Sequence, residues 1–290
     1  MPDASLIFDR ARVRAHRDRA ARAFAQSDFM LRHMAERLAD RLPDMTHRFP
    51  LALDLGAHNG LLAEYVSGLG GIETLVQAER SQPLLRLAGG LRVAADEEFL
   101  PLAENSFDLV MSAGSLHWVN DLPGTLIQIR RILKPDGLLL AMLPGGETLK
   151  ELRHAFEQAE LRASGGISPR VSPFIDVRDA GSLLQRAGFA LPVVDSERLE
   201  VSYAHPLKLL HDLRAMGESN ALMHSRKGFT PCSLLMGMAD EYMRLYAQPD
   251  GRVTASFELV TLTGWKPHPS QQQPAKRGSG QVKLGELFKK

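Results

Sequence analysis

Three carboxylates accompany three short apolar segments of the chain. Asp54 lies near the end of LALDL, Glu79 directly follows IETLVQA, and Asp96 directly follows LRVAA. Segments this short and apolar are typical of strands that are covered on both faces of a sheet. Ligands of open α/β sheets bind outside the carboxyl ends of the strands. We therefore expect the three carboxylates to meet at one ligand-binding edge.

The turn after Asp54 reads GAHNG, and the pattern predicts a helix over 61–69 behind it. A dinucleotide-binding turn needs G-x-G-x-x-G, which is absent here, so a pyrophosphate has no obvious cradle. The pattern Asp-x-Gly-x-x-x-Gly, with Gly56 and Gly60, suits a phosphate-free cofactor whose amino acid end lies against the glycine backbone. His58 stands between the glycines, where a side chain crowds that approach and a positive φ would be strained.

S-adenosylmethionine meets this description. We expect Asp54 near its charged end, Glu79 on the two ribose hydroxyls and Asp96 on the adenine, because carboxylate oxygens can accept hydrogen bonds from these groups. A helix N-terminal charge cluster is the alternative role for the acidic residues after the third strand. The predicted cofactor-binding residues are Asp54, Gly56, His58, Gly60, Glu79, Arg80, Asp96, Glu97, Ser112 and Leu116.

Strand and helix patterns alternate after the lead-in, which predicts a doubly wound, Rossmann-like α/β sheet that is parallel through its fifth strand. A helical segment before the last strand is well placed to cover the crevice as a lid. The predicted parts are a helical lead-in at 1–48, an S-adenosylmethionine-binding domain at 49–204 and 252–266, a helical lid at 205–251, and a poorly ordered tail at 267–290.

The turn after the fourth expected strand holds the candidate catalytic residues, His117 and Trp118. Methyl transfer from a sulfonium depends on holding donor and acceptor in line in a dry site, and no dedicated acid or base is obligatory. We expect His117 either to orient or deprotonate an acceptor, or to cap a helix or pair in the core. Trp118 is expected to pack against the adenosine or the lid. Surface or packing roles are expected first for the other candidates on or near the lid, Tyr203, His205, His211 and Glu218.

The composition is ordinary for a globular protein, with 290 residues, 44% of them hydrophobic and 24% charged. A net charge of +1 gives no general attraction to nucleic acid or to membranes. The longest apolar run, 138–143, is far too short for a membrane span. Cys232 is the only cysteine, so no intrachain disulfide can form and a cytoplasmic location is expected.

Two further patterns concern charged and metal-binding side chains. The histidines are scattered without metal-ligand spacing, so no metal site is predicted. The segment 10–22 is rich in arginine and alanine but is interrupted by Asp18. We interpret it as a solvated helix, with a targeting helix or a basic docking arm as the alternatives.

The glycine turn and the carboxylates together resemble the class I S-adenosylmethionine-dependent methyltransferase superfamily, usually marked by Asp-x-Gly-x-Gly-x-Gly. A narrower resemblance, to the mitochondrial respiratory complex I assembly factor with a methyltransferase fold and its bacterial relatives, covers nearly the whole chain. Its segments are IFDR (7–10), FPLALDLG (49–56), ADEEFLP (95–101), NSFDLV (105–110), SLHWVNDLP (115–123), ILKPDG (132–137), MGESN (216–220), PAKRGSG (274–280) and GEL (285–287).

This narrower resemblance implies an arginine hydroxylase that binds S-adenosylmethionine and modifies a complex I subunit early in assembly. The expected partner is then a protein substrate and not nucleic acid, with peripheral membrane association open and no membrane span. Hydroxylation needs an oxidant, for which the residues themselves offer no mechanism. Two alternatives stay open. One is a carboxyl O-methyltransferase acting on a small molecule or a carrier protein, and the other is a non-catalytic assembly chaperone.

Overall fold

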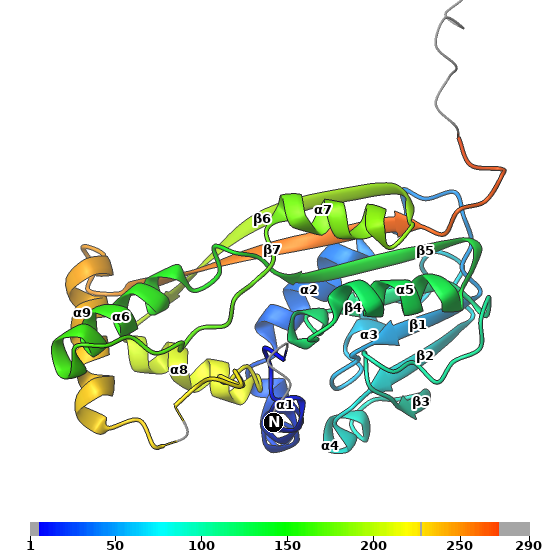
Figure 1. Cartoon of the computed structure of the whole chain (residues 1–290). Coiled ribbons are helices and arrows are strands. Elements are labelled where there is room, and N and C mark those ends of the chain that lie inside the picture. Colours follow the sequence, from blue (N-terminus) through cyan, green and yellow to red (C-terminus); the bar gives the residue numbers. More distant parts are fainter. Residues whose placement is uncertain (1–5, 227, 273–290) are drawn as a thin grey trace, which may run out of the picture.

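The computed structural model describes residues 6–226 and 228–272, and within them the chain forms a seven-stranded sheet with the order β3-β2-β1-β4-β5-β7-β6 (Figure 1). The pairs among the first five strands are parallel, as predicted. β7 runs antiparallel to both of its neighbours. The strands are β1 (Leu51–Leu55), β2 (Thr74–Glu79), β3 (Leu91–Ala94), β4 (Phe107–Ala113), β5 (Leu133–Pro144), β6 (Ala190–Tyr203) and β7 (Val253–Trp265).

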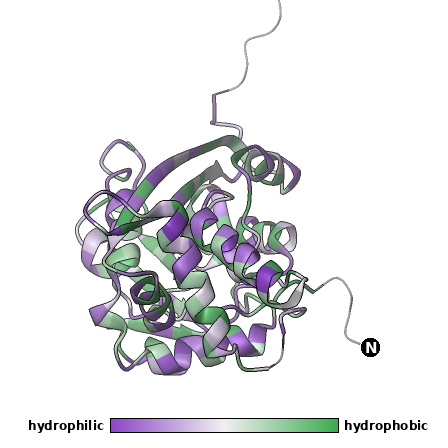
Figure 2. Ribbon diagram, turned by 90° about the vertical axis from the view of Figure 1, so that its left-hand side faces the viewer, coloured by the Kyte–Doolittle hydropathy of each residue, from purple (hydrophilic) through white to green (hydrophobic). Residues whose placement is uncertain are grey.

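Helices cover both faces of the sheet, because alternate strand residues point to opposite sides and both sides are apolar. On one face Ala52 and Leu109 pack in a cluster with side chains of α2 and α3, and on the other Leu53 packs with side chains of α5 and α7. The helices are α1 (Arg10–Ala20), α2 (Phe29–Ala39), α3 (Leu62–Val66), α4 (Gln82–Leu85), α5 (Leu122–Ile132), α6 (Lys150–Ser164), α7 (Val177–Arg186), α8 (Pro206–Ala215) and α9 (Cys232–Tyr246), with 3-10 turns η1 (Phe24–Gln26) and η2 (Leu116–Trp118). The helices visible in Figure 2 carry both hydrophilic and hydrophobic residues, as expected for helices that cover a sheet.

The start of β5 is irregular. The proline and glycine of residues 134–137 are typical of a turn between helix and strand, but the structure includes these residues in β5. Phe107 pairs with Leu133, and the register then shifts before Leu109 pairs with Leu138. Asp136 takes a left-handed backbone with φ of 64° within this irregularity. The glycine and proline signal therefore marks a bulge in the strand rather than a loop.

α8 and α9 lie between β6 and β7 in the chain, inside the predicted lid segment. α9 packs closely on α6, and both lie beside the far ends of the long strands β6 and β7 (Figure 1). The insertion is thus supported by the sheet and by α6.

The N-terminal lead-in also pairs with the predicted lid segment. A short bridge pairs Phe8 with Leu222, flanked by hydrogen bonds from Asp9 N–H to the Ala221 carbonyl and from Met223 N–H to the Ile7 carbonyl. This pairing joins the segment before α1 to the loop after α8. Most of the predicted tail, residues 273–290, lies outside the described residues.

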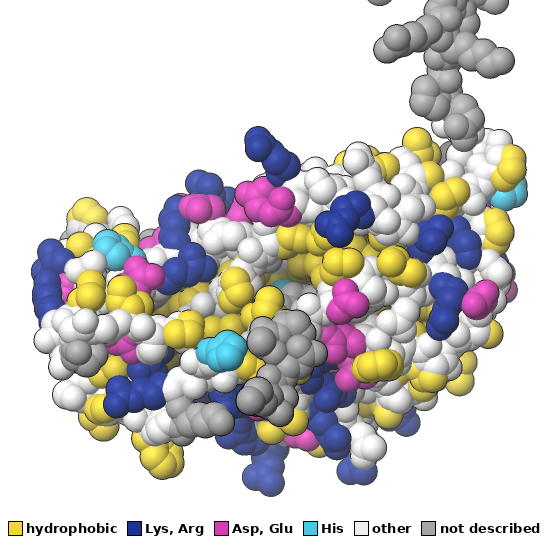
Figure 3. Space-filling view, in the orientation of Figure 1, with side chains coloured by type: hydrophobic (Ala, Val, Ile, Leu, Met, Phe, Trp, Pro, Cys, Tyr) yellow, Lys and Arg dark blue, Asp and Glu magenta, His cyan; other side chains and the backbone are white. Residues whose placement is uncertain are grey.

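The prediction of a solvated helix at 10–22 is wrong for two of its arginines. Arg14 and Arg19 are exposed, and Figure 3 shows Lys and Arg side chains along the lower edge, where α1 lies in Figure 1. Arg17, however, is only 1% exposed, and Arg10 is half-buried. Both enter the edge of the sheet that holds the predicted carboxylates.

Candidate functional site

The predicted carboxylates do meet at the carboxyl edge of the parallel strands. Asp54, Glu79 and Glu97 are each at most 1% exposed. The guanidinium of Arg17 lies between Glu79 and Glu97. Its Nη1 is 3.3 Å from both oxygens of Glu79 and 3.2 Å from Glu97 Oε1, and its Nη2 donates to Ser115 Oγ at 3.1 Å. The edge that we predicted for a cofactor is therefore built around a buried arginine.

Glu79 is the most heavily hydrogen-bonded of these groups. Besides Arg17, its Oε2 accepts from the backbone N–H of His58 at 3.1 Å, and its Oε1 accepts from that of Ser81 at 2.7 Å. The position is the one that we predicted for a ribose-binding carboxylate. In this structure the Glu79 carboxylate binds three elements at once, namely the glycine turn, the start of α4, and α1.

The acidic residues after β3 bind a second arginine of α1. Arg10 forms an ion pair of 2.5 Å with Asp96, and a hydrogen bond and ion pair with Glu97. Arg80, a predicted cofactor residue, approaches Asp96 at 3.2 Å. Burial works to raise the pKa of Glu97, but Arg17 and Arg10 outweigh it and the pKa is lowered. The half-buried Asp96 and the buried Glu97 thus belong to one ion-pair cluster.

Asp54 has a different environment. Its Oδ2 is buried and has no hydrogen-bond partner among the described residues. Burial, followed by the charge of Glu79, raises the pKa of Asp54 to about 8. An unpartnered carboxyl at the end of β1 fits a ligand that carries an ammonium group. The residue types at this edge therefore fit S-adenosylmethionine, although α1 engages Glu79 and Asp96 here.

The glycine turn has the geometry that its sequence predicts. Gly56 and Gly60 both take positive φ angles, of 75° and 82°. A Cβ on Gly56 would lie 2.1 Å from Ser115 Cβ, so only glycine fits where the loop after β4 approaches. His58 has φ of 50°, which confirms the strained backbone expected there.

The His58 ring turns away from the carboxylates. It stacks on Phe24 with 5.6 Å between ring centroids, and its Nε2 lies 3.2 Å from the carbonyl oxygen of Ala113. Burial, followed by the charge of Arg17, lowers the pKa of His58. Its ring helps to line a cavity on the other side of the turn.

This cavity has a volume of about 610 Å³ and lies between the sheet edge, α2 and the lid. Most of the lining side chains are apolar, among them Met30, Met34 and Phe257. Residues of α8 line it too, so the predicted lid segment contributes to this cavity, and its covering of the cofactor crevice stays a prediction. The buried carboxylates at the strand ends are not part of the lining, and two of them, Glu79 and Glu97, lie beneath α1 instead.

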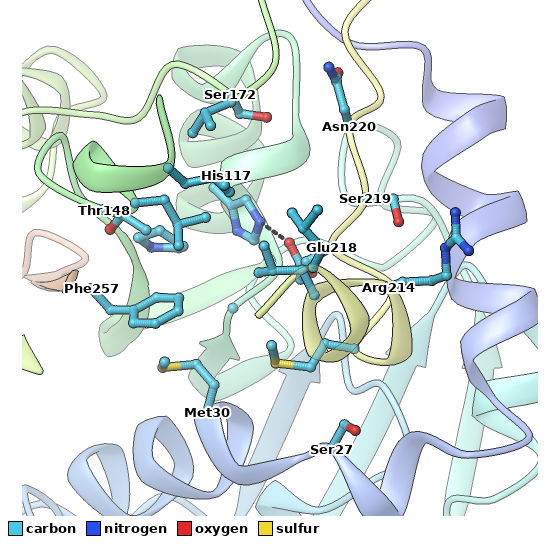
Figure 4. Close-up of a pocket in the computed structure, with 18 of the residues that line it drawn as sticks. Ser27, Met30, His117, Thr148, Ser172, Arg214, Glu218, Ser219, Asn220 and Phe257 are labelled. Atoms are coloured by element: carbon cyan, nitrogen blue, oxygen red, sulfur yellow. Dashed lines mark hydrogen bonds and ion pairs between the residues drawn. The ribbon is translucent and has the colours of Figure 1, made fainter. Parts of the chain in front are cut away.

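Both predicted catalytic residues line the cavity, and both bind the same carboxylate. Figure 4 shows the contact between His117 and Glu218. His117 Nε2 lies 2.9 Å from Glu218 Oε2, and the indole N–H of Trp118 donates to the same oxygen at 2.9 Å. Burial works to raise the pKa of Glu218, but the His117 ring and then Arg17 outweigh it, so the pKa is lowered. Glu218, for which we expected a surface or packing role, is therefore part of the site. The sequence signal was its place in the MGESN segment.

The other candidates take smaller parts. Ser112 lies buried in β4 with its hydroxyl unpartnered among the described residues, and Leu116 is buried in the core. His205 caps α8 by accepting from Leu207 N–H at 3.2 Å, which is a structural role. His211 is exposed at the cavity lining. The Tyr203 hydroxyl is buried, and burial raises its pKa.

The described residues contain neither a metal-ligand cluster nor a membrane-spanning helix. No group of three or more His, Cys, Asp or Glu side chains in residues 6–226 and 228–272 could hold a metal ion. Within the same ranges, none of the helices combines the length and the apolar character needed to cross a membrane.

Comparisons with known proteins agree with this geometry. A family model described as a methyltransferase domain matches residues 53–141. The YcgJ protein of Bacillus subtilis has a TM-score of 0.55 at 14% identity, covering 80% of this chain and 98% of that one. Phosphoethanolamine N-methyltransferase 2 of Haemonchus contortus, solved with S-adenosyl-L-methionine, has a TM-score of 0.54 at 14% identity, covering 87% of this chain and 57% of that one. The strand order and these likenesses define a class I methyltransferase fold.

Longer sequence matches identify the family. The protein named arginine-hydroxylase NDUFAF5, mitochondrial, is 42% identical in Danio rerio, covering 98% of this chain and 90% of the relative. The human protein of that name is 43% identical, covering 98% and 84%. A malonyl-[acyl-carrier protein] O-methyltransferase of Laribacter hongkongensis is 36% identical, covering 89% and 90%. The chain belongs to the NDUFAF5 family within the methyltransferase superfamily.

Proposed function

We propose that this protein is an S-adenosylmethionine-dependent enzyme that modifies an arginine side chain of a protein, namely a subunit of respiratory complex I during its assembly. The full-length similarity to relatives named arginine-hydroxylase supports the arginine substrate. The complex I role rests on the sequence segments that resemble the assembly factor, such as MGESN and SLHWVNDLP. The methyltransferase domain match supports the cofactor.

The observation that carries the proposal is the carboxylate of Glu218 in the cavity. His117 and Trp118 both bind its Oε2, so Oε1 is left without a hydrogen-bond partner among the described residues. The lowered pKa keeps the group ionised at neutral pH. A half-buried anion with a free oxygen in a mostly apolar cavity suits a cationic side chain. A guanidinium offers a planar set of donors for such an oxygen and apolar methylenes for the cavity wall.

The arginines that line the cavity are not paired with this carboxylate. Arg170 lines the cavity, but its guanidinium is bound to Glu160 at 2.7 Å. Figure 4 shows Arg214 directed away from Glu218. His117 therefore acts as a positioning residue, because it holds Glu218 rather than a reacting atom.

The cofactor would be held at the strand ends. Asp54 would face its ammonium group, Glu79 and Asp96 its nucleoside, and the Gly56 to Gly60 turn its amino acid end. S-adenosylmethionine supplies a methyl group activated on a sulfonium when it is bound. An added oxygen would require an oxidant in addition, so the modification itself is the quantity to measure.

A carboxyl O-methyltransferase is the rival enzyme, supported by the similarity to the Laribacter hongkongensis protein. The ionised Glu218 would repel a carboxylate substrate, which favours the cationic one. The chaperone alternative predicts that assembly continues when cofactor binding is lost. A cytoplasmic location remains part of our proposal, to be tested by cell fractionation.

The test is peptide mass spectrometry of complex I subunits from cells with and without the gene. We expect an arginine that carries a gene-dependent mass, either of a methyl group or of an oxygen. Complementation with E218Q should abolish it, whereas the matched variant E197Q should not. Glu197 also binds a histidine, His33, at 2.7 Å, but outside the cavity lining. A gene-dependent mass on an acidic side chain, or none on any subunit, would contradict the proposal.

A further inference from the structure

Arg17 stands where the cofactor's ribose is expected, and we infer that a nucleoside cofactor binds to this protein only after α1 has withdrawn Arg17 from Glu79. The inference rests on the proposed S-adenosylmethionine function. It goes further in assigning α1 as an internal occupant of the cofactor edge and Arg17 as the residue that decides whether that edge is open. The contacts of Glu79, of Arg10 and of the N-terminal segment carry the argument.

The acceptor capacity of Glu79 is already used. A carboxylate has about four lone-pair sites. The backbone N–H groups of His58 and Ser81 take one on each oxygen, and Arg17 Nη1 approaches both oxygens at 3.3 Å. The two backbone donors belong to the glycine turn and to the α4 cap, which are fixed parts of the fold. The two ribose hydroxyls can therefore form hydrogen bonds with Glu79 only if they replace Arg17.

The same helix engages the predicted adenine position. Arg10 binds Asp96 and Glu97, and its Nη1 also donates to the carbonyl of Trp118 at 3.1 Å. Arg10 and Arg17 are about two helical turns apart and so lie on one face of α1. A single helix face thus covers both of the positions that the cofactor's nucleoside would use.

Besides its ion pairs, α1 is held mainly by single polar contacts, among them a hydrogen bond from Ser81 Oγ to Asp18 at 2.6 Å. Its buried residues are Val13, Arg17 and Ala20, so the helix buries little apolar surface besides its ion pairs. The exposed Arg14 and Arg19 make only contacts within the helix. A ligand that takes the carboxylates from Arg10 and Arg17 therefore removes the ion pairs that join α1 to the sheet edge.

Displacement of α1 would also reach the substrate cavity. His16 Nδ1 lies 3.1 Å from the Ser219 carbonyl oxygen, and Arg12 donates to Ser225 Oγ at 2.8 Å. The Phe8 to Leu222 bridge precedes α1 directly. Because Ser219 follows Glu218 directly, a displacement of α1 would shift the loop that positions the Glu218 carboxylate.

Hydrogen exchange of the wild-type protein tests the inference directly. We expect saturation with S-adenosylhomocysteine to increase exchange at the amides of 10–20 by about tenfold or more, with a smaller increase at 218–225. Exchange at β1 and β4 should stay unchanged or fall. Binding of S-adenosylhomocysteine with unchanged or slower exchange over 10–20 would overturn the inference while leaving the cofactor proposal intact.

Calorimetry of variants gives an independent measure. Arg17→Met should bind S-adenosylhomocysteine about tenfold more tightly than wild type, because no competing guanidinium remains. Arg17→Lys keeps a competing cation and should stay close to wild type, as should the control Arg14→Met on the exposed face of α1. Equal affinities for Arg17→Met and Arg14→Met would contradict the inference. Failure of both wild type and Arg17→Met to bind the ligand would instead refute the cofactor proposal on which it rests.

Discussion

Replacing Asp54 by asparagine should stabilise the fold at neutral and higher pH while weakening cofactor binding. The folded protein keeps the Asp54 carboxyl protonated up to about pH 8, because burial and the charge of Glu79 raise its pKa. The unfolded chain loses that proton near its ordinary pKa of 3.8. Between these values the unfolded state binds fewer protons, so the free energy of unfolding falls as pH rises.

The size of the effect follows from this window. A difference of one bound proton between the folded and unfolded states changes the free energy of unfolding by up to about 1.4 kcal/mol per pH unit. D54N removes the titrating group but keeps a similar shape, so it lacks this slope. From pH 5 to pH 7, the stability of D54N relative to wild type should therefore increase by up to about 3 kcal/mol.

Urea unfolding at pH 5, 6 and 7 measures the difference between the two proteins. Asp28 offers a matched control, since it is 5% exposed but both of its oxygens accept from Arg32. D28N should be less stable than wild type, because it loses a paired charge. A D54N curve parallel to that of wild type over this pH range would refute the reasoning about Asp54.

Three further substitutions test other contacts of the site. E79A should lower the free energy of unfolding in urea by about 3 to 5 kcal/mol, because it leaves Arg17 buried without its main partner. E79Q should lower it less, and equal losses for the two variants would contradict the ion-pair account. H58G places a glycine at a positive φ but deletes a buried ring, so we expect the free energy of unfolding, measured by thermal unfolding, to fall by about 1 to 2 kcal/mol. A rise in the free energy of unfolding would show that backbone strain at His58 outweighs the packing of its ring. W118F keeps the ring packing but removes the indole donor to Glu218, so an arginine peptide should bind less tightly in calorimetry while S-adenosylhomocysteine affinity is unchanged; unchanged peptide affinity would argue against the cavity as the substrate site.

The strand-end carboxylates could be predicted because their position follows from local pattern. Short apolar segments predict buried strands, and parallel strands bring their carboxyl ends to one edge, so Asp54, Glu79 and Asp96 had to be neighbours. The same reasoning located the turn with His117 and Trp118, and it located the helical insertion.

The arginine contacts could not be predicted in the same way. Nothing in the local pattern of α1 distinguishes Arg17, which is buried, from Arg14 and Arg19, which are exposed. The difference arises from contacts with Glu79 and Glu97, which lie far away in the chain. Glu218 was underestimated for the same reason, since its partners are about 100 residues away. Periodicity predicts which face of an element is apolar, but not which distant charge a polar side chain will meet.

The position of β7 has a consequence for how the chain folds during synthesis. β7 lies between β5 and β6 in the sheet, although it follows both of them in sequence. Until Val253–Trp265 has left the ribosome, β6 has no strand beside it and β5 keeps one open edge. The parallel part from β1 to β5 can assemble earlier, whereas the lid and β6 must wait for the last strand. Nascent chains that end before β7 should therefore expose an unpaired β5 edge, and they should be the species that chaperones bind and proteases cut.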